Sequence, residues 1–305
     1  MNIKSVPKKQ LWGIELNLIS LLFSSISPVL NKFSLTSLSP VVGGIFTSTF
    51  AAIFTFATIL ITHQHVSLTN LKNLWLWLLG GTNAIGIILQ YIALSTLSPI
   101  TVTLIARMYL VYVFFLSYVF LKEKITKWDY LAIILCILGS FFISGSRLQF
   151  SDNLLGLICA FIYPLMYAAN NIVAKYLVSD EEPNNVLFFN HFTSALLLFC
   201  YALITGTSFS HISSQAVAFN FGGAFFNGFM SLLLFYTSLQ FITAGKANIV
   251  RALGPVIVII YSSFFFPVQV TPSLVLGAVL VILASTIVTF TRTNGSTSSS
   301  VDTQI

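Results

Sequence analysis

The sequence repeats itself at long range. Three residues of the first half, Gly13, Lys32 and Pro40, recur in the second half as Gly156, Lys175 and Pro183, each displaced by the same 143 residues. From Tyr91 onward the displacement is 145, which aligns Tyr91 with Tyr236, Val111 with Val256, Val113 with Val258, Ser117 with Ser262, Thr126 with Thr271 and Ser140 with Ser285. Lysine is rare in this chain, so a lysine followed eight residues later by proline in both halves indicates a duplication.

The apolar segments between these marks are long enough to cross a membrane. The chain is 56% hydrophobic and 7% charged, whereas about a quarter of the residues of a soluble domain are charged. About 20 apolar residues cross the hydrocarbon core as a helix, so the sequence predicts an all-α integral membrane protein with ten transmembrane helices. The predicted spans are Trp12–Asn31, Pro40–Thr62, Leu74–Leu97, Pro99–Leu121, Trp128–Ser146, Leu154–Tyr176, Val186–Ile204, Ala216–Phe241, Ala247–Phe266 and Ser273–Phe290. A β-barrel would need short segments of alternating polarity, and these runs are continuous.

The spans divide into two five-helix repeats, over residues 12–146 and 154–290. We expect a cytoplasmic N-terminal segment at residues 1–11 and a disordered, Ser/Thr-rich cytoplasmic tail at 291–305. Because five is an odd number, the second repeat must enter the membrane inverted relative to the first. Inverted repeats place a binding site near the midplane and can open it alternately to each side, so this arrangement favours a carrier.

The positive charges predict the orientation, because Lys and Arg are retained in cytoplasmic loops. With the N-terminus inside, the cytoplasmic segments hold Lys4, Lys8, Lys9, Lys72, Lys122, Lys124, Lys127, Lys175, Lys246 and Arg292. The outer loops hold only Lys32 and Arg147. Both termini are therefore predicted to be cytoplasmic. The net charge of +6 is explained by these loops and does not indicate a nucleic-acid partner.

Further sequence features resemble those of a known family. The first predicted span of each half runs from a glycine to a lysine, and the fourth ends in Phe120-Leu121-Lys122-Glu123-Lys124. With two five-helix halves over residues 11–290, the chain resembles the ten-helix EamA-type permeases of the drug/metabolite transporter superfamily. It departs from their pattern at Lys122 and Ala132, where glycine is usual, and at Val268, where a second-half glutamate often lies.

The resemblance implies a secondary transporter of a small metabolite, with spans three, four, eight and nine around a central cavity. It would be a multi-pass protein of the bacterial cytoplasmic (inner) membrane. The expected partners are a small-molecule substrate and the lipid bilayer, and the expected state is a monomer or homodimer.

Two arginines are the main candidates for substrate binding. Arg107 lies eight residues past Pro99, roughly 12 Å along a helix and so near the middle of the bilayer. Arg251 lies in the corresponding span nine with Asn248 three residues before it, and Thr103 holds the matching place relative to Arg107. A charge at this depth must face protein, water or an anion. The pair predicts a site for a carboxylate or phosphate; the alternative is that each arginine caps helix-end carbonyls or reaches an interface.

Spans three and six carry polar residues that share a face. Asn83 and Gln90 are seven residues apart, and Tyr163, Tyr167 and Asn170 follow at helical steps of four and three. We predict that these side chains contact the substrate. Hydrogen bonding and close packing between helices are the alternative explanation.

Few titratable residues are candidates for other chemistry. Glu15 is predicted to be the only intramembrane carboxylate, and thus the one candidate for proton coupling, although its place near the cytoplasmic end favours an interfacial role. His191 is interpreted as a structural residue, and His63 and His65 lack metal-binding neighbours. Cys136, Cys159 and Cys200 fall in different spans and are predicted to be small buried apolar residues.

Motifs for other functions do not occur in the sequence. A phosphate-binding loop, a Gly-x-Ser-x-Gly elbow and a His-Glu-x-x-His pair are all absent, so no cofactor and no catalytic residue are predicted. An intramembrane enzyme would need a carboxylate or nucleophile pair at depth. We therefore predict a secondary transporter, with an anionic or zwitterionic solute favoured by the arginines. A carrier of a neutral or cationic solute, and a non-transporting scaffold or sensor, are the alternatives.

Overall fold

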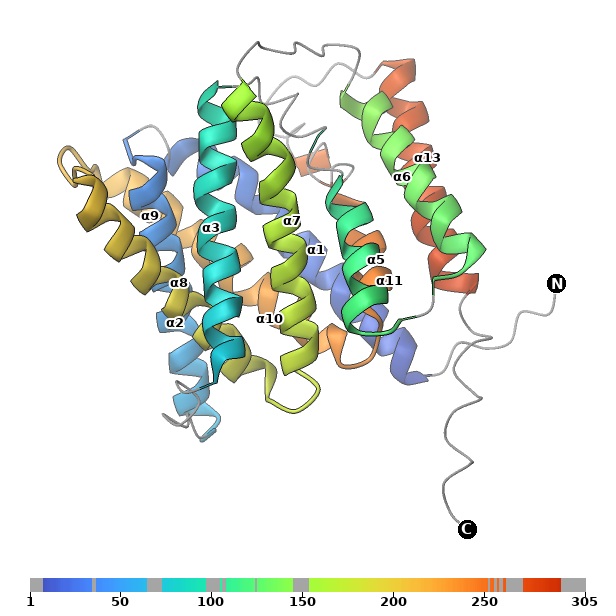
Figure 1. Ribbon diagram of the computed structural model, residues 1–305, viewed down its shortest axis with the longest axis horizontal. Helices are drawn as coiled ribbons and strands as arrows, with labels where there is room; N and C mark the ends of the chain where they lie inside the picture. The colour runs from blue at the N-terminus through green and yellow to red at the C-terminus, as the bar shows by residue number, and fades with distance from the viewer. Residues whose placement is uncertain are drawn as a thin grey trace.

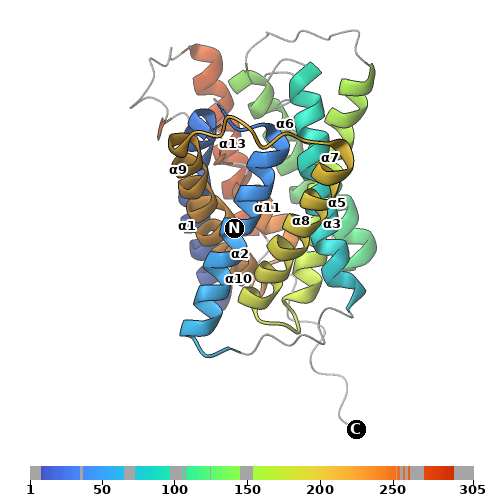
Figure 2. The same ribbon diagram turned by 90° about the vertical axis from the view of Figure 1, so that its left-hand side faces the viewer.

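The computed structural model describes residues 8–34, 37–64, 73–96, 105, 108–123, 125–144, 154–251, 253–254, 257, 260–261 and 271–291. Over these residues the regular elements are helices, gathered into one bundle (Figures 1 and 2). The first half contains α1 (Lys8–Ser34), α2 (Pro40–Ile61), α3 (Leu74–Thr96), α5 (Met108–Phe120) and α6 (Lys127–Ser144). The second half contains α7 (Leu154–Leu177), α8 (Pro183–Thr205), α9 (Ser214–Gly223), η2 (Ala224–Ser231), α10 (Leu232–Leu239), α11 (Ala244–Arg251) and α13 (Pro272–Thr291).

The helices have the lengths and compositions of membrane helices. Four are each long and apolar enough to cross a membrane: α2, α7, α8 and the continuous run from α9 to α10. Shorter apolar helices occur within α3, α5 and α13. Most predicted spans begin and end within a few residues of a helix. The predicted span Ala216–Phe241 is the run α9–η2–α10, whose middle part, η2, is a π-helix.

The predicted start of span nine differs from the start of the helix, and the difference changes the place of a lysine. Helix α11 begins at Ala244, three residues before the predicted start of span nine. Lys246, counted above among the loop lysines, therefore lies in the first turn of a helix and is only 3% exposed. The small residues Ala244 and Gly245 allow the helix to start here, inside the bundle, because a β-carbon at Gly245 would already lie 2.8 Å from the Phe114 ring.

The repeated prolines have a local structural role. Pro40 and Pro183 are the first residues of α2 and α8, where a missing N–H costs nothing and the fixed φ angle suits a helix. Ser39 caps α2 by accepting a hydrogen bond from the Val42 N–H. Helix α8 ends at Gly206, whose φ of 64° is a left-handed conformation that glycine adopts easily. The duplicated sequence marks thus begin equivalent helices in the two halves.

Helix packing is symmetric under exchange of the two halves. Helix α2 packs against its repeat equivalent α8, and α6 against its equivalent α13; the second pair lies side by side at one edge of the bundle in Figure 1. The contact of α3 with α7 is matched by that of α1 with α9, η2 and α10. Likewise, the contact of α5 with α7 is matched by that of α1 with α11. The duplication is therefore present in the packing as well as in the sequence.

The first helices of the two halves run in opposite directions. Gly13, near the start of α1, packs so closely on the joint between α10 and α11 that a β-carbon there would lie 2.8 Å from that of Phe241. Lys175, near the end of α7, reaches the same joint, where its Nζ donates to the Ile242 carbonyl at 3.0 Å. The start of α1 and the end of α7 thus lie at the same end of the bundle.

The outer surface of the bundle is apolar. On α8, for example, Leu196, Phe199 and Leu203 are exposed at helical spacing. Cys200 lies in the same stripe and is exposed, so its prediction as a buried residue is wrong: a cysteine is apolar enough to sit on a face turned away from the core. Cys136 and Cys159 are buried.

Candidate functional site

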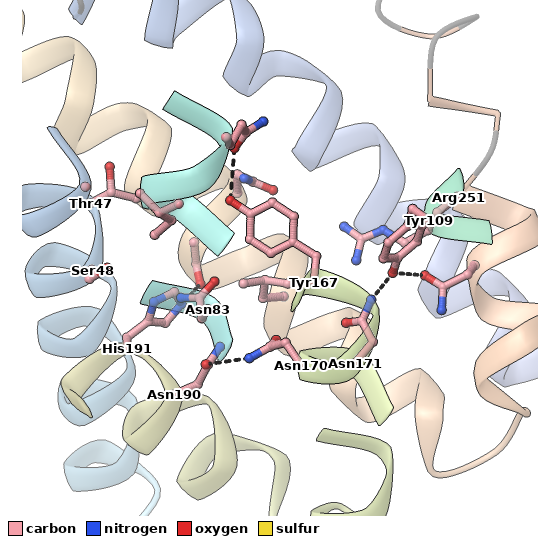
Figure 3. A pocket seen from close by; sticks show the side chains of 17 residues that line it. Thr47, Ser48, Asn83, Tyr109, Tyr167, Asn170, Asn171, Asn190, His191 and Arg251 are labelled. Carbon is pink, nitrogen blue, oxygen red and sulfur yellow. Dashed lines mark hydrogen bonds between the residues drawn. The ribbon is translucent and has the colours of Figure 1, made fainter. Parts of the chain in front are cut away.

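A cavity of about 410 Å³ lies between the two halves (Figure 3). Side chains from α2, α3 and α5 of the first half and from α7, α8, η2, α10 and α11 of the second half surround it. The described lining residues are Gly44, Thr47, Ser48, Asn83, Ile87, Gln90, Tyr109, Tyr167, Asn170, Asn171, Asn190, His191, Asn227, Gly228, Leu232, Asn248 and Arg251. The volume is within the range of about 300–1,000 Å³ that is usual for small-molecule sites.

Six of the residues proposed from the sequence meet in this cavity: Asn83, Gln90, Tyr167, Asn170, Asn248 and Arg251. Tyr163 is buried beside it, with its ring edge-on to that of Tyr167 at 6.0 Å between centroids, and is not part of the described lining. Arg107 and Thr103 lie outside the described residues. Glu15 is exposed on α1, away from the cavity.

Arg251 is held by an aromatic ring and a hydroxyl. Its Cζ lies 4.3 Å from the centroid of the Phe235 ring, a cation–π arrangement, and its Nη2 donates to Ser231 Oγ at 3.0 Å. Ser231 is in turn fixed from α1, because Ser20 Oγ donates to the Ser231 carbonyl at 2.7 Å. Asn17, one turn earlier on α1, donates to the Ala247 carbonyl of α11 at 2.7 Å. Helix α1 thus positions both elements that carry the arginine and its hydroxyl partner.

Tyr109 joins three helices beside Arg251. Its hydroxyl donates to Asn248 Oδ1 at 2.5 Å and accepts a hydrogen bond from Asn171 Nδ2 (Figure 3). Asn248 also donates to the Ala244 carbonyl one turn earlier at 2.8 Å, which fixes its amide. We call the group Tyr109, Asn171, Asn248 and Arg251 the cationic end of the cavity.

The opposite side of the cavity carries uncharged polar groups. Asn170 Nδ2 donates to Asn190 Oδ1 at 3.1 Å, and Asn190 Nδ2 donates to the Tyr236 hydroxyl at 2.9 Å. The Tyr236 hydroxyl in turn donates to Asn170 Oδ1 at 3.4 Å. This closed triangle of buried groups ties α7, α8 and α10 together. Asn83 is fixed separately, through a 2.9 Å hydrogen bond to Ser194 Oγ.

His191 contacts the π-helix on this side. Its Nε2 lies 2.7 Å from the Gly228 carbonyl of η2; since a carbonyl only accepts, Nε2 carries the proton and neutral imidazole leaves Nδ1 as an acceptor. That Nδ1 is buried and has no hydrogen-bond partner among the described residues. Gly228 itself is required by space, because a β-carbon there would lie 2.9 Å from that of Ala51. We call the group Ser48, Asn83, Asn190 and His191 the neutral end of the cavity.

Tyr167 lies between the two ends (Figure 3). Its hydroxyl donates to Gln90 Oε1 at 2.9 Å, so α7 and α3 are bridged across the cavity wall. The ring packs on the backbone of α3 at Gly86, where a β-carbon would lie 2.8 Å from the ring. Glycine at this position therefore sets the orientation of the tyrosine.

None of the described carboxylates lines the cavity. Glu15 is exposed, Glu123 accepts from the Ala244 N–H at 3.1 Å on the joint before α11, and Asp180, Glu181 and Glu182 lie in the turn before α8. The prediction that Glu15 is the only intramembrane carboxylate is wrong, because the predicted span Trp128–Ser146 also contains Asp129. Asp129 is in the first turn of α6 and buried, where its Oδ2 accepts from the Thr126 N–H at 2.7 Å. A carboxylate at that position satisfies the open N–H groups of a helix start.

Sequence reasoning missed several residues of the site. Tyr109, Asn171 and Asn190 were not singled out, and His191 was interpreted as structural only. The first three were detectable in principle, because each is a polar interruption in an apolar helix, and such residues are usually functional or paired. Ser48 and Asn227 resemble many other small polar residues of the chain, and only the packing distinguishes them.

Comparisons with known proteins agree with this architecture. The EamA-like transporter family model matches residues 11–145 and again residues 154–290. One solved crystal structure superimposes with a TM-score of 0.79 over 90% of this chain and 95% of its own length, at 12% identity. At that identity the likeness shows the fold alone. No curated protein matches the sequence.

Proposed function

Because this chain belongs to the EamA-like transporter family, we propose that it is a secondary transporter that moves a small organic anion or zwitterion across the membrane by alternating access. The observation that carries the proposal is the polar cavity between the halves with Arg251 in its wall. An arginine offers a planar pair of N–H donors that suits a carboxylate or phosphate. Asn248 and Tyr109 lie beside it to orient the bound group.

We further propose ten transmembrane helices in two inverted repeats, with both termini in the cytoplasm of a bacterial cell. Contacts between chain segments predicted on the same side of the membrane support this topology. Ser37 and Ser213, in loops assigned to the outside, are 3.0 Å apart between their Oγ atoms. Gln64, after α2, and Asn184, in the first turn of α8, are both assigned to the inside and are hydrogen-bonded at 3.0 Å. The opposite directions of α1 and α7 are expected of inverted repeats.

Alternating access requires the two halves to move relative to each other around the cavity. The composition of the lining supports such a movement, since residues of both halves line the cavity. The polar side chains at its two ends come from several different helices. Arg107, which lies outside the described residues, is proposed to add a second cation from the first half, with Thr103 near it. We propose that the protein works as a monomer or homodimer and uses no cofactor.

A ligand-stabilisation screen of the purified protein, followed by flux measurements in proteoliposomes, tests the proposal. A solute that binds only the folded state raises the apparent melting temperature. We expect stabilisation by a carboxylate-containing solute and its counterflow into vesicles that hold the same solute inside. Stabilisation only by neutral or cationic solutes would reject the anion site. Binding without any flux would favour a sensor or scaffold.

A further inference from the structure

We propose that the substrate is a net anion whose second polar group is an uncharged hydrogen-bonding group, as in a 2-hydroxy carboxylic acid, and that zwitterionic amino acids are poor substrates. The inference rests on the proposed function and narrows it, since it assigns the carboxylate with its neighbouring hydroxyl to the cationic end and the uncharged remainder of the ligand to the neutral end of the same cavity.

The charge balance of the cavity is the first argument. Arg251 is the only charged side chain among the described lining residues. The chain has eight acidic residues in all. Six of them are described, and none of these six lines the cavity. The other two, Asp152 and Asp302, lie outside both the described residues and the predicted spans. An ion enclosed in protein without a partner is costly. A bound anion lowers the positive charge of the site at Arg251, and still lowers it if Arg107 adds a second cation, whereas a zwitterion adds as much positive charge as negative and leaves the site as cationic as before.

The neutral end provides the second argument. Its groups are two amides, a hydroxyl and an imidazole, which can each exchange hydrogen bonds with a hydroxyl or carbonyl. An ammonium ion gives up much more hydration on entering a closed site, and such sites usually compensate it with a carboxylate. The cavity wall offers none among its described residues. His191 Nδ1, buried and without a described partner, is an acceptor for a hydroxyl further along the ligand, such as the 3-hydroxyl of glycerate, once the imidazole turns towards it.

The arrangement of the two ends is the third argument. Figure 3 shows Arg251 and Tyr109 on one side, Asn190 and His191 on the other, and Tyr167 between them. A molecule that spans the cavity therefore places its carboxylate at the Arg251 cation. The rest of the molecule lies against the neutral polar groups. In a 2-amino acid the ammonium is fixed next to the carboxylate, and so next to the Arg251 cation. Replacing the ammonium with a hydroxyl removes this repulsion.

Isosteric pairs that differ only in this group provide the test. We would measure the affinities of the full-length protein for lactate and alanine, glycerate and serine, and 3-phenyllactate and phenylalanine. We expect the hydroxy acid of at least one pair to bind about tenfold or more tightly than its amino acid, which corresponds to about 1.4 kcal/mol. An amino acid that binds as tightly as its hydroxy acid partner in every pair, or no binding by either series, would overturn this inference. Equal binding would leave the proposed anion carrier standing, because both partners carry the carboxylate.

A charge-adding variant gives a second, independent readout. Asn83→Asp places a carboxylate at the neutral end with little change in size. We expect Asn83→Asp to lower the affinity for the hydroxy acid several-fold. The ratio of hydroxy acid affinity to the affinity for the matching amino acid should fall by at least about tenfold. The control is Asn73→Asp, which adds the same charge outside the cavity, where Asn73 Oδ1 caps α3 by accepting from the Trp75 N–H at 3.0 Å; aspartate caps equally well. An unchanged preference in a folded Asn83→Asp protein would contradict the proposal.

Discussion

At the residue scale, the surroundings of Arg251 decide what the cavity can bind. A guanidinium carries five N–H donors, and among the described residues the hydrogen bond to Ser231 engages one nitrogen. The Phe235 ring covers one face of the group at 4.3 Å and stabilises the charge without competing for the remaining donors. The arginine is thus positioned firmly and still offers donors for a ligand.

Tyr109 gives a prediction at this scale. Tyr109→Phe removes the hydroxyl that joins Asn171 to Asn248 and leaves two amide groups without that partner. We expect a free-energy loss of about 1–3 kcal/mol in stability, together with weaker carboxylate binding, because the neighbours of Arg251 lose their fixed orientation. Thermal unfolding and ligand titration would measure the two effects.

The control for that variant is Tyr118→Phe, since Tyr118 is on the same helix but exposed on its outer face. Tyr118→Phe should change neither the stability nor the carboxylate affinity. A Tyr109→Phe protein with wild-type stability and affinity would show that the hydroxyl does not organise the cationic end.

At the element scale, the joint between α10 and α11 is a point where both halves meet. Lys175 of α7 donates to the carbonyls of Leu239 and Ile242, where a helix end carries partial negative charge. Glu123 accepts from the Ala244 N–H at the start of α11, where the partial charge is positive. Two residues that identify the family in the sequence are therefore helix caps in the structure. In the repeat alignment, Glu123 matches Val268, which has no carboxylate, and Ala244 matches Pro99, which has no N–H.

A substitution at this joint gives the second prediction. Lys175→Met keeps most of the side-chain volume and removes the cation that caps α10. We expect a loss of about 1–2 kcal/mol in stability, because the Leu239 and Ile242 carbonyls lose the hydrogen bonds that Lys175 donates. Lys127→Met, at an exposed position, is the matched control. Equal melting temperatures of the two variants in the same detergent would contradict the capping role.

The sequence predicted the elements better than the site. Apolar length predicts helices such as α2 and α7 to within one residue at each end, whereas α8 begins at Pro183, three residues before its predicted start, because proline suits the first position of a helix. The start of α11 was misplaced because Lys246 reads as a loop residue, and only the packing shows that the bundle encloses it. The cavity residues Asn171 and Asn190 were missed for a related reason: helical spacing identifies a face but not the neighbour that faces it.

At the scale of the whole molecule, hydrogen bonds between loops provide a test of topology. Because Ser37 and Ser213 are in contact, the loops that follow α1 and α8 must lie on one side of the membrane. In a cysteine-free background, which requires replacing exposed Cys200 as well as Cys136 and Cys159, we expect Ser210→Cys to be labelled by an impermeant thiol reagent from outside. Ser179→Cys, in the turn after α7, should be labelled only after permeabilisation.

External labelling of Ser179→Cys in intact cells would contradict the inverted ten-helix topology. Labelling of neither position before permeabilisation would place both loops inside and so contradict the membrane crossing of α8 between them. Detergent-solubilised protein serves as the control for reactivity, since both thiols should react there.

The measurement that tests the central claim most directly is the affinity of Arg251 variants for the tightest-binding carboxylate of the screened series. Arg251→Gln removes the charge, and we expect its dissociation constant to rise at least about tenfold, or about 1.4 kcal/mol. Arg251→Lys should lose less, because it keeps the charge but not the planar pair of donors. Wild-type affinity in a folded, membrane-inserted Arg251→Gln protein would contradict the account of this cavity as an anion site.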